Sequence, residues 1–202
     1  MRNHYILFSI FLLCAFQSRA QVTFQPGIRA GANFSDLTET NASYKTDFYA
    51  GGLLAINFTK RYTLQPEIIY SRQGANNAET YYYDFNTDMN IEGRDDISIN
   101  YISLCATNKF NVYKGFHITV GPTLDFLIDT NIHNKESDID VAIVTGFGYK
   151  FPSGLALEFR FKKGIADVVN SEYYEGGDDF LFGDYNTNLL FQVGAAYYFD
   201  LK

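Results

Sequence analysis

Histidine and cysteine, which often perform acid–base or nucleophilic chemistry, number only three and two in this chain of 202 residues. A hydrolase needs a nucleophile, a base and an orienting acid that converge on one point. His117 and Asp125 fall on the same side of an extended segment, but at about 3.3 Å per residue they are too far apart for direct contact. We therefore predict no catalytic residues, and interpret His117 as a hydrogen-bonded interior histidine and His133 as a solvated loop residue.

Acidic residues are more numerous, with 23 Asp and Glu against 16 Lys and Arg. Most of them fall in four long polar segments, 35–46, 74–95, 129–138 and 163–187. An acidic surface formed by these segments is suited to divalent cations that bridge lipid phosphates, or to a basic partner. It shows no fixed ligand spacing, so we predict a solvated acidic surface with no metal site and no cofactor. The negative net charge of −7 argues against nucleic acid as a partner.

The first twenty residues, MRNHYILFSIFLLCAFQSRA, have the pattern of a signal peptide with cleavage after Ala20. An anchoring helix needs about 20 apolar residues, more than this run provides. Leu13 disfavours a lipidated Cys14, because a small residue precedes such a cysteine. We predict a signal peptide at 1–20 and one domain at 21–202, with Cys105 as the only remaining cysteine and no internal disulfide.

The rest of the chain alternates apolar and mixed residues with the period of two that is typical of strands. In the last such segment Leu189, Phe191 and Val193 alternate with Leu190, Gln192 and Gly194. Eight segments show the pattern: 24–34, 48–58, 62–71, 101–110, 116–128, 139–150, 155–162 and 188–199. Short turns at 59–61, 111–114 and 151–153 alternate with the four long polar segments. The sequence predicts an all-β fold, an eight-stranded antiparallel up-and-down transmembrane β-barrel with short periplasmic turns and long extracellular loops.

The mixed face indicates which side of the barrel meets lipid. It is rich in Gly and Ala, which suit a confined interior, whereas the apolar face carries aromatic residues near strand ends, as membrane-interface girdles do. We therefore predict that the apolar face meets lipid and that charges on the mixed face pair across a filled lumen. The alternative is that these are strand-end charges in water. The predicted lumen charges are Arg29, Glu67, Lys109, Asp125, Glu158 and Arg160, with Lys162 beside them.

Several strands carry a family resemblance. The segments GIRAGANFS (27–35), LQPEIIYSRQG (64–74), YISLCATNKF (101–110), GFHITVGPTLDFLI (115–128) and GLALEFRF (154–161) resemble the PorT-like outer-membrane β-barrel family. The end of the chain also resembles the C-terminal signal that the barrel-assembly machinery reads, at Gln192, Gly194, Tyr197 and Phe199. The resemblance implies the outer membrane of a Gram-negative bacterium, with outer-membrane lipid and the assembly machinery as partners.

The expected function is that of a non-enzymatic outer-membrane barrel whose loops serve surface contact or envelope organisation. The family's name comes from a member linked to protein secretion and gliding, so an accessory role in secretion is also implied by the resemblance. The extracellular partner is not identified by the sequence. A membrane-embedded lipid hydrolase or acyltransferase is the alternative, and a pore is disfavoured by the filled lumen of eight strands.

Overall fold

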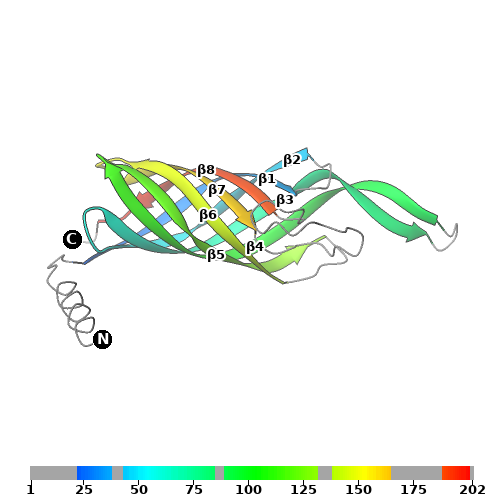
Figure 1. Ribbon diagram of the computed structural model, residues 1–202, viewed down its shortest axis with the longest axis horizontal. Helices are drawn as coiled ribbons and strands as arrows, with labels where there is room; N and C mark the ends of the chain where they lie inside the picture. Colours follow the sequence, from blue (N-terminus) through cyan, green and yellow to red (C-terminus); the bar gives the residue numbers. More distant parts are fainter. Residues whose placement is uncertain (1–21, 38–42, 85–88, 132–137, 165–187, 201–202) are drawn as a thin grey trace, which may run out of the picture.

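The computed structural model describes residues 22–37, 43–84, 89–131, 138–164 and 188–200. These residues form eight antiparallel strands that wind into a closed barrel (Figure 1). The strands are β1 (Thr23–Leu37), β2 (Ser43–Asn57), β3 (Tyr62–Asp84), β4 (Met89–Tyr113), β5 (Phe116–Thr130), β6 (Ile139–Lys150), β7 (Leu155–Gly164) and β8 (Asn188–Tyr198). The predicted signal peptide at 1–20 and His133 lie outside the described residues.

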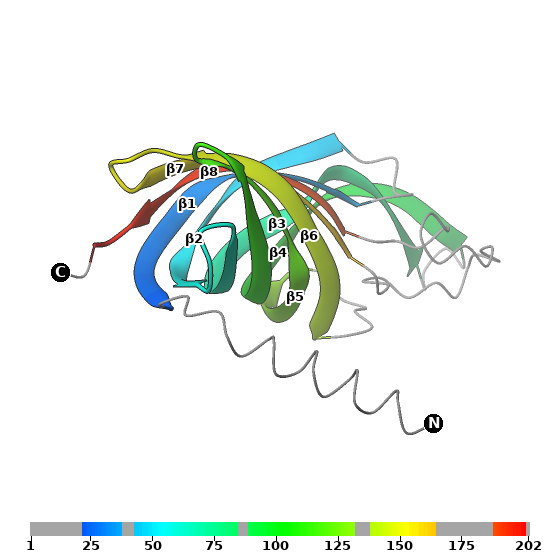
Figure 2. The same ribbon diagram turned by 60° about the vertical axis from the view of Figure 1, so that its left-hand side comes forward.

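Each strand pairs with its neighbours in the chain, and β8 pairs with β1 to close the ring (Figure 2). Closure matters because hydrocarbon offers no partner for the backbone groups of an open edge. At the closing seam Gly31 faces Gly194. The prediction of an eight-stranded up-and-down barrel is confirmed. None of the described residues belongs to a helix long and apolar enough to cross a membrane.

Several strands are longer than the sequence predicts, mainly toward the end of the barrel where the long loops lie. The prediction of a loop at 74–95 is wrong for most of its length, because β3 runs to Asp84 and β4 begins at Met89. Smaller parts of the other predicted loops are also strand: Ser35–Leu37, Ser43–Thr46, Asp129–Thr130 and Lys163–Gly164. At the opposite end β4 continues through Asn111–Tyr113, so the predicted turn 111–114 narrows to Lys114 and Gly115, both with positive φ.

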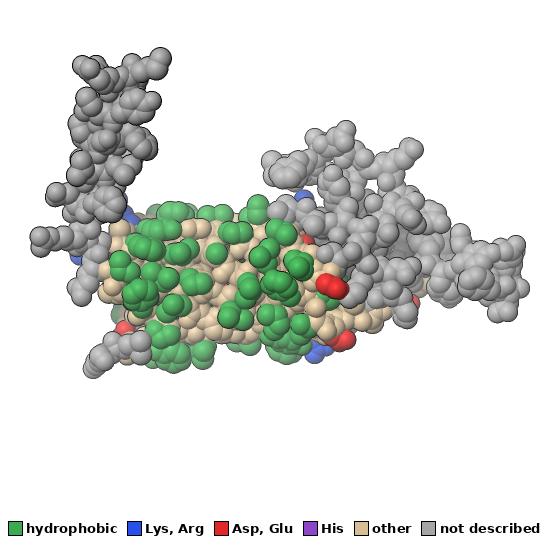
Figure 3. Space-filling model, turned by 90° about the horizontal axis from the view of Figure 1, so that it is seen from below, with side chains coloured by type: hydrophobic (Ala, Val, Ile, Leu, Met, Phe, Trp, Pro, Cys, Tyr) green, Lys and Arg blue, Asp and Glu red, His purple; other side chains and the backbone are tan. Residues whose placement is uncertain are grey.

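The outer wall of the barrel is apolar. Phe24, Ile68 and Phe147 expose 56%, 61% and 60% of their surface, and hydrophobic side chains cover much of the wall in Figure 3. Near the short turns, aromatic rings pack in pairs between adjacent strands, as in Phe116 and Tyr149, whose centroids are 4.7 Å apart. Since exposed apolar area on this scale is stable only against lipid, the prediction that the apolar face points outward is confirmed.

The lumen is packed with side chains. Small residues on the inner face provide the space, since a Cβ added at Gly148 would lie 2.7 Å from Nε2 of His117, and one at Gly146 would lie 2.9 Å from Cγ of Arg160. Near the short turns a small apolar cluster fills the interior, formed by Leu53, Ala55, Ala156, Ala196 and Tyr198. Farther toward the long loops, buried charged and polar side chains share the interior with apolar ones such as Ile99 and Leu190.

Candidate functional site: the lumen network and the projecting hairpin

Glu67 lies at the centre of a buried ionic network. Arg29 Nη1 donates to Glu67 Oε2 at 2.7 Å. Arg160 approaches the same carboxylate with both terminal nitrogens, Nη1 to Oε2 at 2.9 Å and Nη2 to Oε1 at 2.8 Å. This paired geometry is the strong form of an arginine–carboxylate contact. All three side chains are almost completely buried.

A second carboxylate, Glu158, extends the network toward the short turns. It accepts a hydrogen bond from Arg160 Nη2 at 2.9 Å and from Lys109 Nζ at 2.5 Å. His117 Nε2 lies 3.4 Å from Glu158 Oε1. Two acids thus hold two arginines and one lysine in a single cluster. We call these five residues, Arg29, Glu67, Lys109, Glu158 and Arg160, the lumen network.

Neutral polar side chains add further hydrogen bonds to the lumen network. Gln65 and Thr107 donate to Glu67 Oε1 at 2.6 and 3.1 Å. Tyr49 accepts a hydrogen bond from Arg29 Nη2 at 3.2 Å, and the Tyr198 hydroxyl donates to Gln65 Oε1 at 2.8 Å. Buried charges are tolerated when such partners satisfy them. The arrangement therefore closes the lumen with side chains that are committed to one another.

Of the predicted lumen charges, the structure brings five together and places Asp125 apart from them. Asp125 forms an ion pair with Lys162 instead, and it faces Asp140 across the β5–β6 ladder. Asp140 is also buried and was not among the predicted lumen charges. The sequence analysis also gave no partner to His117, which contacts Glu158. The sequence analysis missed Tyr49 and Tyr198 as residues that contact the network, although the alternation along β2 and β8 places both on the inward face.

The described residues offer little for covalent chemistry. His117 Nδ1 lies 3.4 Å from the Gly115 carbonyl oxygen, so its two nitrogens face a backbone acceptor and Glu158. Cys105 donates from Sγ to Thr123 Oγ1 at 3.2 Å. In the described part of the chain no three or more His, Cys, Asp or Glu side chains form a group able to hold a metal ion. The arrangement suits packing and charge pairing better than catalysis.

The predicted assembly signal lies on β8 and just beyond it. Gln192 points inward and donates to Asn33 Oδ1 at 2.9 Å, and Gly194 meets Gly31 at the seam. Tyr197 and Phe199 point outward, with ring centroids 5.5 Å apart. Gln192 and Gly194 therefore lie on the lumen side, and Tyr197 and Phe199 on the lipid side, at the strand that closes the ring.

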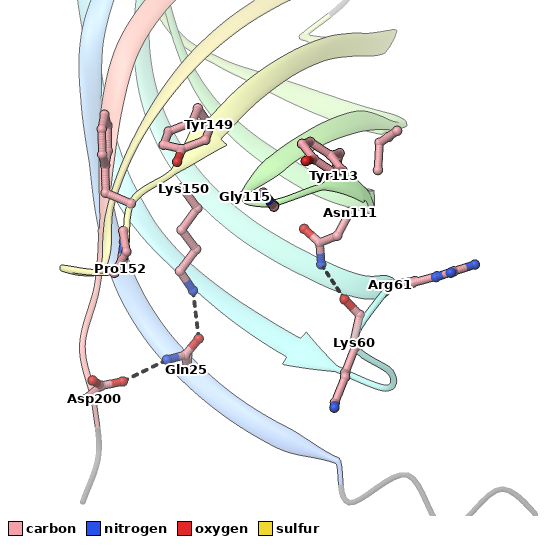
Figure 4. Close-up of a pocket in the computed structure, with 14 residues that line it drawn as sticks. Gln25, Lys60, Arg61, Asn111, Tyr113, Gly115, Tyr149, Lys150, Pro152 and Asp200 are labelled. Atoms are coloured by element: carbon pink, nitrogen blue, oxygen red, sulfur yellow. Dashed lines mark hydrogen bonds between the residues drawn. The ribbon is translucent and has the colours of Figure 1, made fainter.

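A hollow opens at the short-turn end of the barrel (Figure 4). Lys150 points into it and donates to Gln25 Oε1 at 2.9 Å, and Gln25 donates to Asp200 Oδ1 at 3.0 Å. The Lys150 ammonium also lies 4.1 Å from the centre of the Tyr198 ring, the residue whose hydroxyl joins the lumen network. Polar contacts thus continue from the mouth of the barrel to its interior.

At the opposite end, β3 and β4 continue beyond the ring as a two-stranded hairpin (Figures 1 and 2). Pairing of β2 with β3 ends at Asn76, and pairing of β5 with β4 begins only at Ile99. Beyond these points the two strands pair with each other alone. We call the segments Ala78–Asp84 and Met89–Asp95 the projecting hairpin. Within the described residues its two outer edges have no strand beside them.

The base of the projecting hairpin is tied to the barrel by polar contacts. Gly74 N donates to Ser35 Oγ at 2.9 Å, and Ser35 Oγ donates to the Gly74 carbonyl at 2.8 Å. Lys45 Nζ donates to the Ile97 carbonyl at 2.9 Å. A bulge between Ala75 and Ala78 then turns the strand, with Asn77 in the left-handed region. The hairpin therefore leaves the barrel from a fixed base.

Several solved structures are similar to this chain. Neisserial surface protein A is 13% identical over 87% of this chain and 97% of its own, with a TM-score of 0.51, and this likeness supports the barrel fold. The attachment invasion locus protein Ail of Yersinia pestis is 11% identical over 87% of this chain and 99% of its own, with a TM-score of 0.48. The N-terminal β-barrel domain of OprF from Pseudomonas aeruginosa is 12% identical over 88% of this chain and 100% of its own, with a TM-score of 0.41. No curated protein matches the chain.

Comparison with family models gives the more specific result. Residues 16–170 match the model described as outer membrane protein beta-barrel domain. This match supports the outer-membrane part of the resemblance seen in the sequence, while the narrower PorT-like assignment stays a prediction. Together with the apolar outer wall, it shows that the chain belongs to the outer membrane protein β-barrel domain family and is located in the outer membrane of a Gram-negative bacterium.

Proposed function

We propose that this protein is a non-enzymatic outer-membrane barrel that acts in surface contact or envelope organisation, with the projecting hairpin as its contact element. The observation that carries the proposal is the division of the molecule into a lumen closed by paired charges and a hairpin with open strand edges. The first favours a structural role for the described lumen residues over transport or catalysis, because their charges are buried and paired with one another. The second offers strand edges that no other described strand pairs with.

The hairpin is suited to contact because of its backbone. A strand edge without a neighbour presents N–H and C=O groups that another extended segment can pair with. The sequence of the two segments adds four acids, Glu79, Asp84, Glu92 and Asp95, against one base, Arg94. A basic extended segment would therefore be attracted, and a second copy of the same acidic hairpin repelled.

The experiment is to replace Ala78–Asp95 with a short Gly/Ser connection and express the variant in a strain that lacks the gene. Loop closure depends only weakly on length, so the barrel should still insert and show heat-modifiable migration. We expect the variant to lose complementation of the deletion phenotype. The matched control replaces the turn Thr59–Arg61, at the opposite end, with Gly/Ser, and should complement.

The same strains separate this function from a lipid hydrolase or acyltransferase. The composition of phospholipid and lipid A should be equal in the deletion strain and the wild type. A changed lipid profile that the hairpin-trimmed protein restores would favour the enzymatic alternative over contact.

Two narrower roles rest on the sequence resemblance. We propose that Gln192, Gly194, Tyr197 and Phe199 are read by the barrel-assembly machinery, which the exposed Tyr197–Phe199 pair at the closing strand supports. We also keep an accessory role in secretion as a proposal, since the PorT-like resemblance is its only support. Outer-membrane lipid is the partner of the apolar wall.

A further inference from the structure

Two adjacent turns at the short-turn end of the barrel bring three cations together. The turn between β2 and β3 carries Lys60 and Arg61, and the turn between β4 and β5 carries Lys114. Asn111 joins them, because its backbone N donates to the Arg61 carbonyl at 2.8 Å and its Nδ2 to the Lys60 carbonyl at 3.2 Å (Figure 4). We call Lys60, Arg61 and Lys114 the basic turn cluster.

The basic turn cluster has no anionic partner in the described part of the chain. All three residues are exposed, and none of them forms an ion pair with another described residue. The short turns 58–61, 114–115 and 151–154 contain no Asp or Glu. Among the described residues that line the hollow in Figure 4, the one acid is Asp200, which accepts a hydrogen bond from Gln25. This end of the barrel is therefore basic, whereas the projecting hairpin at the other end is acidic.

Aromatic rings on the outer wall lie beside the cluster. Phe58, Tyr62 and Phe110 form an aromatic row, in which successive ring centroids are 5.8 and 5.6 Å apart. Tyr113 is 62% exposed, and Lys114 Nζ lies 5.2 Å from the centre of its ring. Aromatic rings in such positions mark the depth of the lipid headgroups. Because every cation of the cluster lies within two positions of one of these aromatic residues in the chain, the three charges lie close to the headgroups.

We propose that the basic turn cluster binds the headgroup of an anionic phospholipid in the periplasmic leaflet of the outer membrane. Lysine and arginine both bind phosphate oxygens, and basic side chains next to a membrane attract anionic lipids. The aromatic row adds an apolar surface for the upper part of the lipid, which a soluble phosphate compound would not use. Lys150 is not part of this site, because it points into the hollow and donates to Gln25. The site lies at the opposite end from the projecting hairpin and does not depend on the contact role proposed for it.

The test measures the dissociation constant of phosphatidylglycerol by native mass spectrometry of the purified protein in nonionic detergent micelles. Phosphatidylcholine, whose headgroup has no net charge, is titrated in parallel. The variant combines Lys60→Gln with Arg61→Gln. The matched control combines Lys45→Gln with Arg72→Gln, which removes one lysine and one arginine near the long-loop end.

Each basic residue beside an anionic lipid surface contributes about fivefold in affinity, so the cluster variant should bind phosphatidylglycerol roughly tenfold or more weakly than wild type. We expect the control to bind it as wild type does, and phosphatidylcholine to bind all three proteins equally. Equal phosphatidylglycerol affinity in wild type and the cluster variant would overturn the proposal. So would an equal loss in the control, because net charge and not the cluster would then decide binding.

Two further comparisons with wild type separate the possible occupants of the cluster. Glycerol phosphate, the soluble headgroup alone, should bind far more weakly than phosphatidylglycerol. If it binds as tightly, the cluster is a site for a soluble phosphate compound and the lipid proposal is wrong. Equal affinity for phosphatidylglycerol and phosphatidylcholine would also contradict the proposal, and would favour an acidic segment of a periplasmic protein as the occupant.

Discussion

The lumen network and the projecting hairpin are both polar, but they differ in whether their hydrogen-bonding groups are paired. In the network, Glu67 and Glu158 receive contacts from cationic side chains of β1, β4 and β7. Gln65 and Thr107 also donate to Glu67. In the hairpin, two strands satisfy each other along one edge and leave their outer edges without a strand among the described residues. This difference indicates that the interior stabilises the barrel, whereas the hairpin is available to a partner.

The largest effect on stability should follow from removing the central acid of the network. Glu67→Ala leaves the guanidinium groups of Arg29 and Arg160 buried without their main partner, and breaking a buried ion pair in this way costs about 3–5 kcal/mol. The free energy of unfolding, measured by urea titration in lipid vesicles, checks this. Glu67→Gln, which keeps the volume and one oxygen, should lose less. Equal losses for the two variants would contradict this ranking and show that the lost charge, and not the lost volume, accounts for the whole effect.

The outer wall should be the next most sensitive region. Val120 points outward on β5 and exposes 40% of its surface. Val120→Arg places a charge in the lipid and should cost about 2–4 kcal/mol near the bilayer midplane. Thr119, its inward-facing neighbour, is 2% exposed, and Thr119→Ser keeps the hydroxyl and should be tolerated. Comparable folding yields in bilayers for Val120→Arg and wild type would contradict the facing of the strands.

An ion pair at the rim should matter far less than one in the lumen. Arg72 Nε lies 3.3 Å from Asp47 Oδ2, but the arginine side chain is 41% exposed. Water screens such a pair, so Asp47→Asn should change the free energy of unfolding by at most about 1 kcal/mol. The same urea titration measures it beside Glu67→Ala. A loss as large as that of Glu67→Ala would mean that burial is not what separates the two sites.

The sequence predicts the barrel well because lipid imposes a regular pattern on it. An outer residue such as Ile68 must be apolar and its neighbour Glu67 must face the lumen, so the period of two reports strand and facing together. The projecting hairpin was predicted as a loop because no membrane surrounds it. Both of its faces can be polar, and the Tyr and Thr at 80–83, which favour strands, show no alternation there.

The candidate site is less predictable for a geometric reason. The alternation of side chains along each strand shows that Arg29, Glu67 and Arg160 face inward, but it does not show which of them contact one another. Their contacts join β1, β3 and β7 across the lumen, between residues separated by 38 and 93 positions in the chain. Such meetings depend on the stagger of the strands around the barrel. The same stagger brings Lys162 of β7 to Asp125 of β5.

The subtlest expected difference needs no mutation and concerns local opening. Amide hydrogen exchange of the protein in micelles should be faster in Ala78–Asp84 than in Gln65–Ser71 of the same strand. The latter segment pairs with strands on both sides, whereas the former, among the described strands, pairs only with β4. A two-stranded ribbon is marginally stable by itself, so its amides open without global unfolding. If both segments exchange equally slowly in the isolated protein, a further element must already cover the hairpin edges, and the hairpin would no longer be a free surface for a partner. If addition of a basic extended peptide slows only Ala78–Asp84, pairing at the open edge is the better explanation.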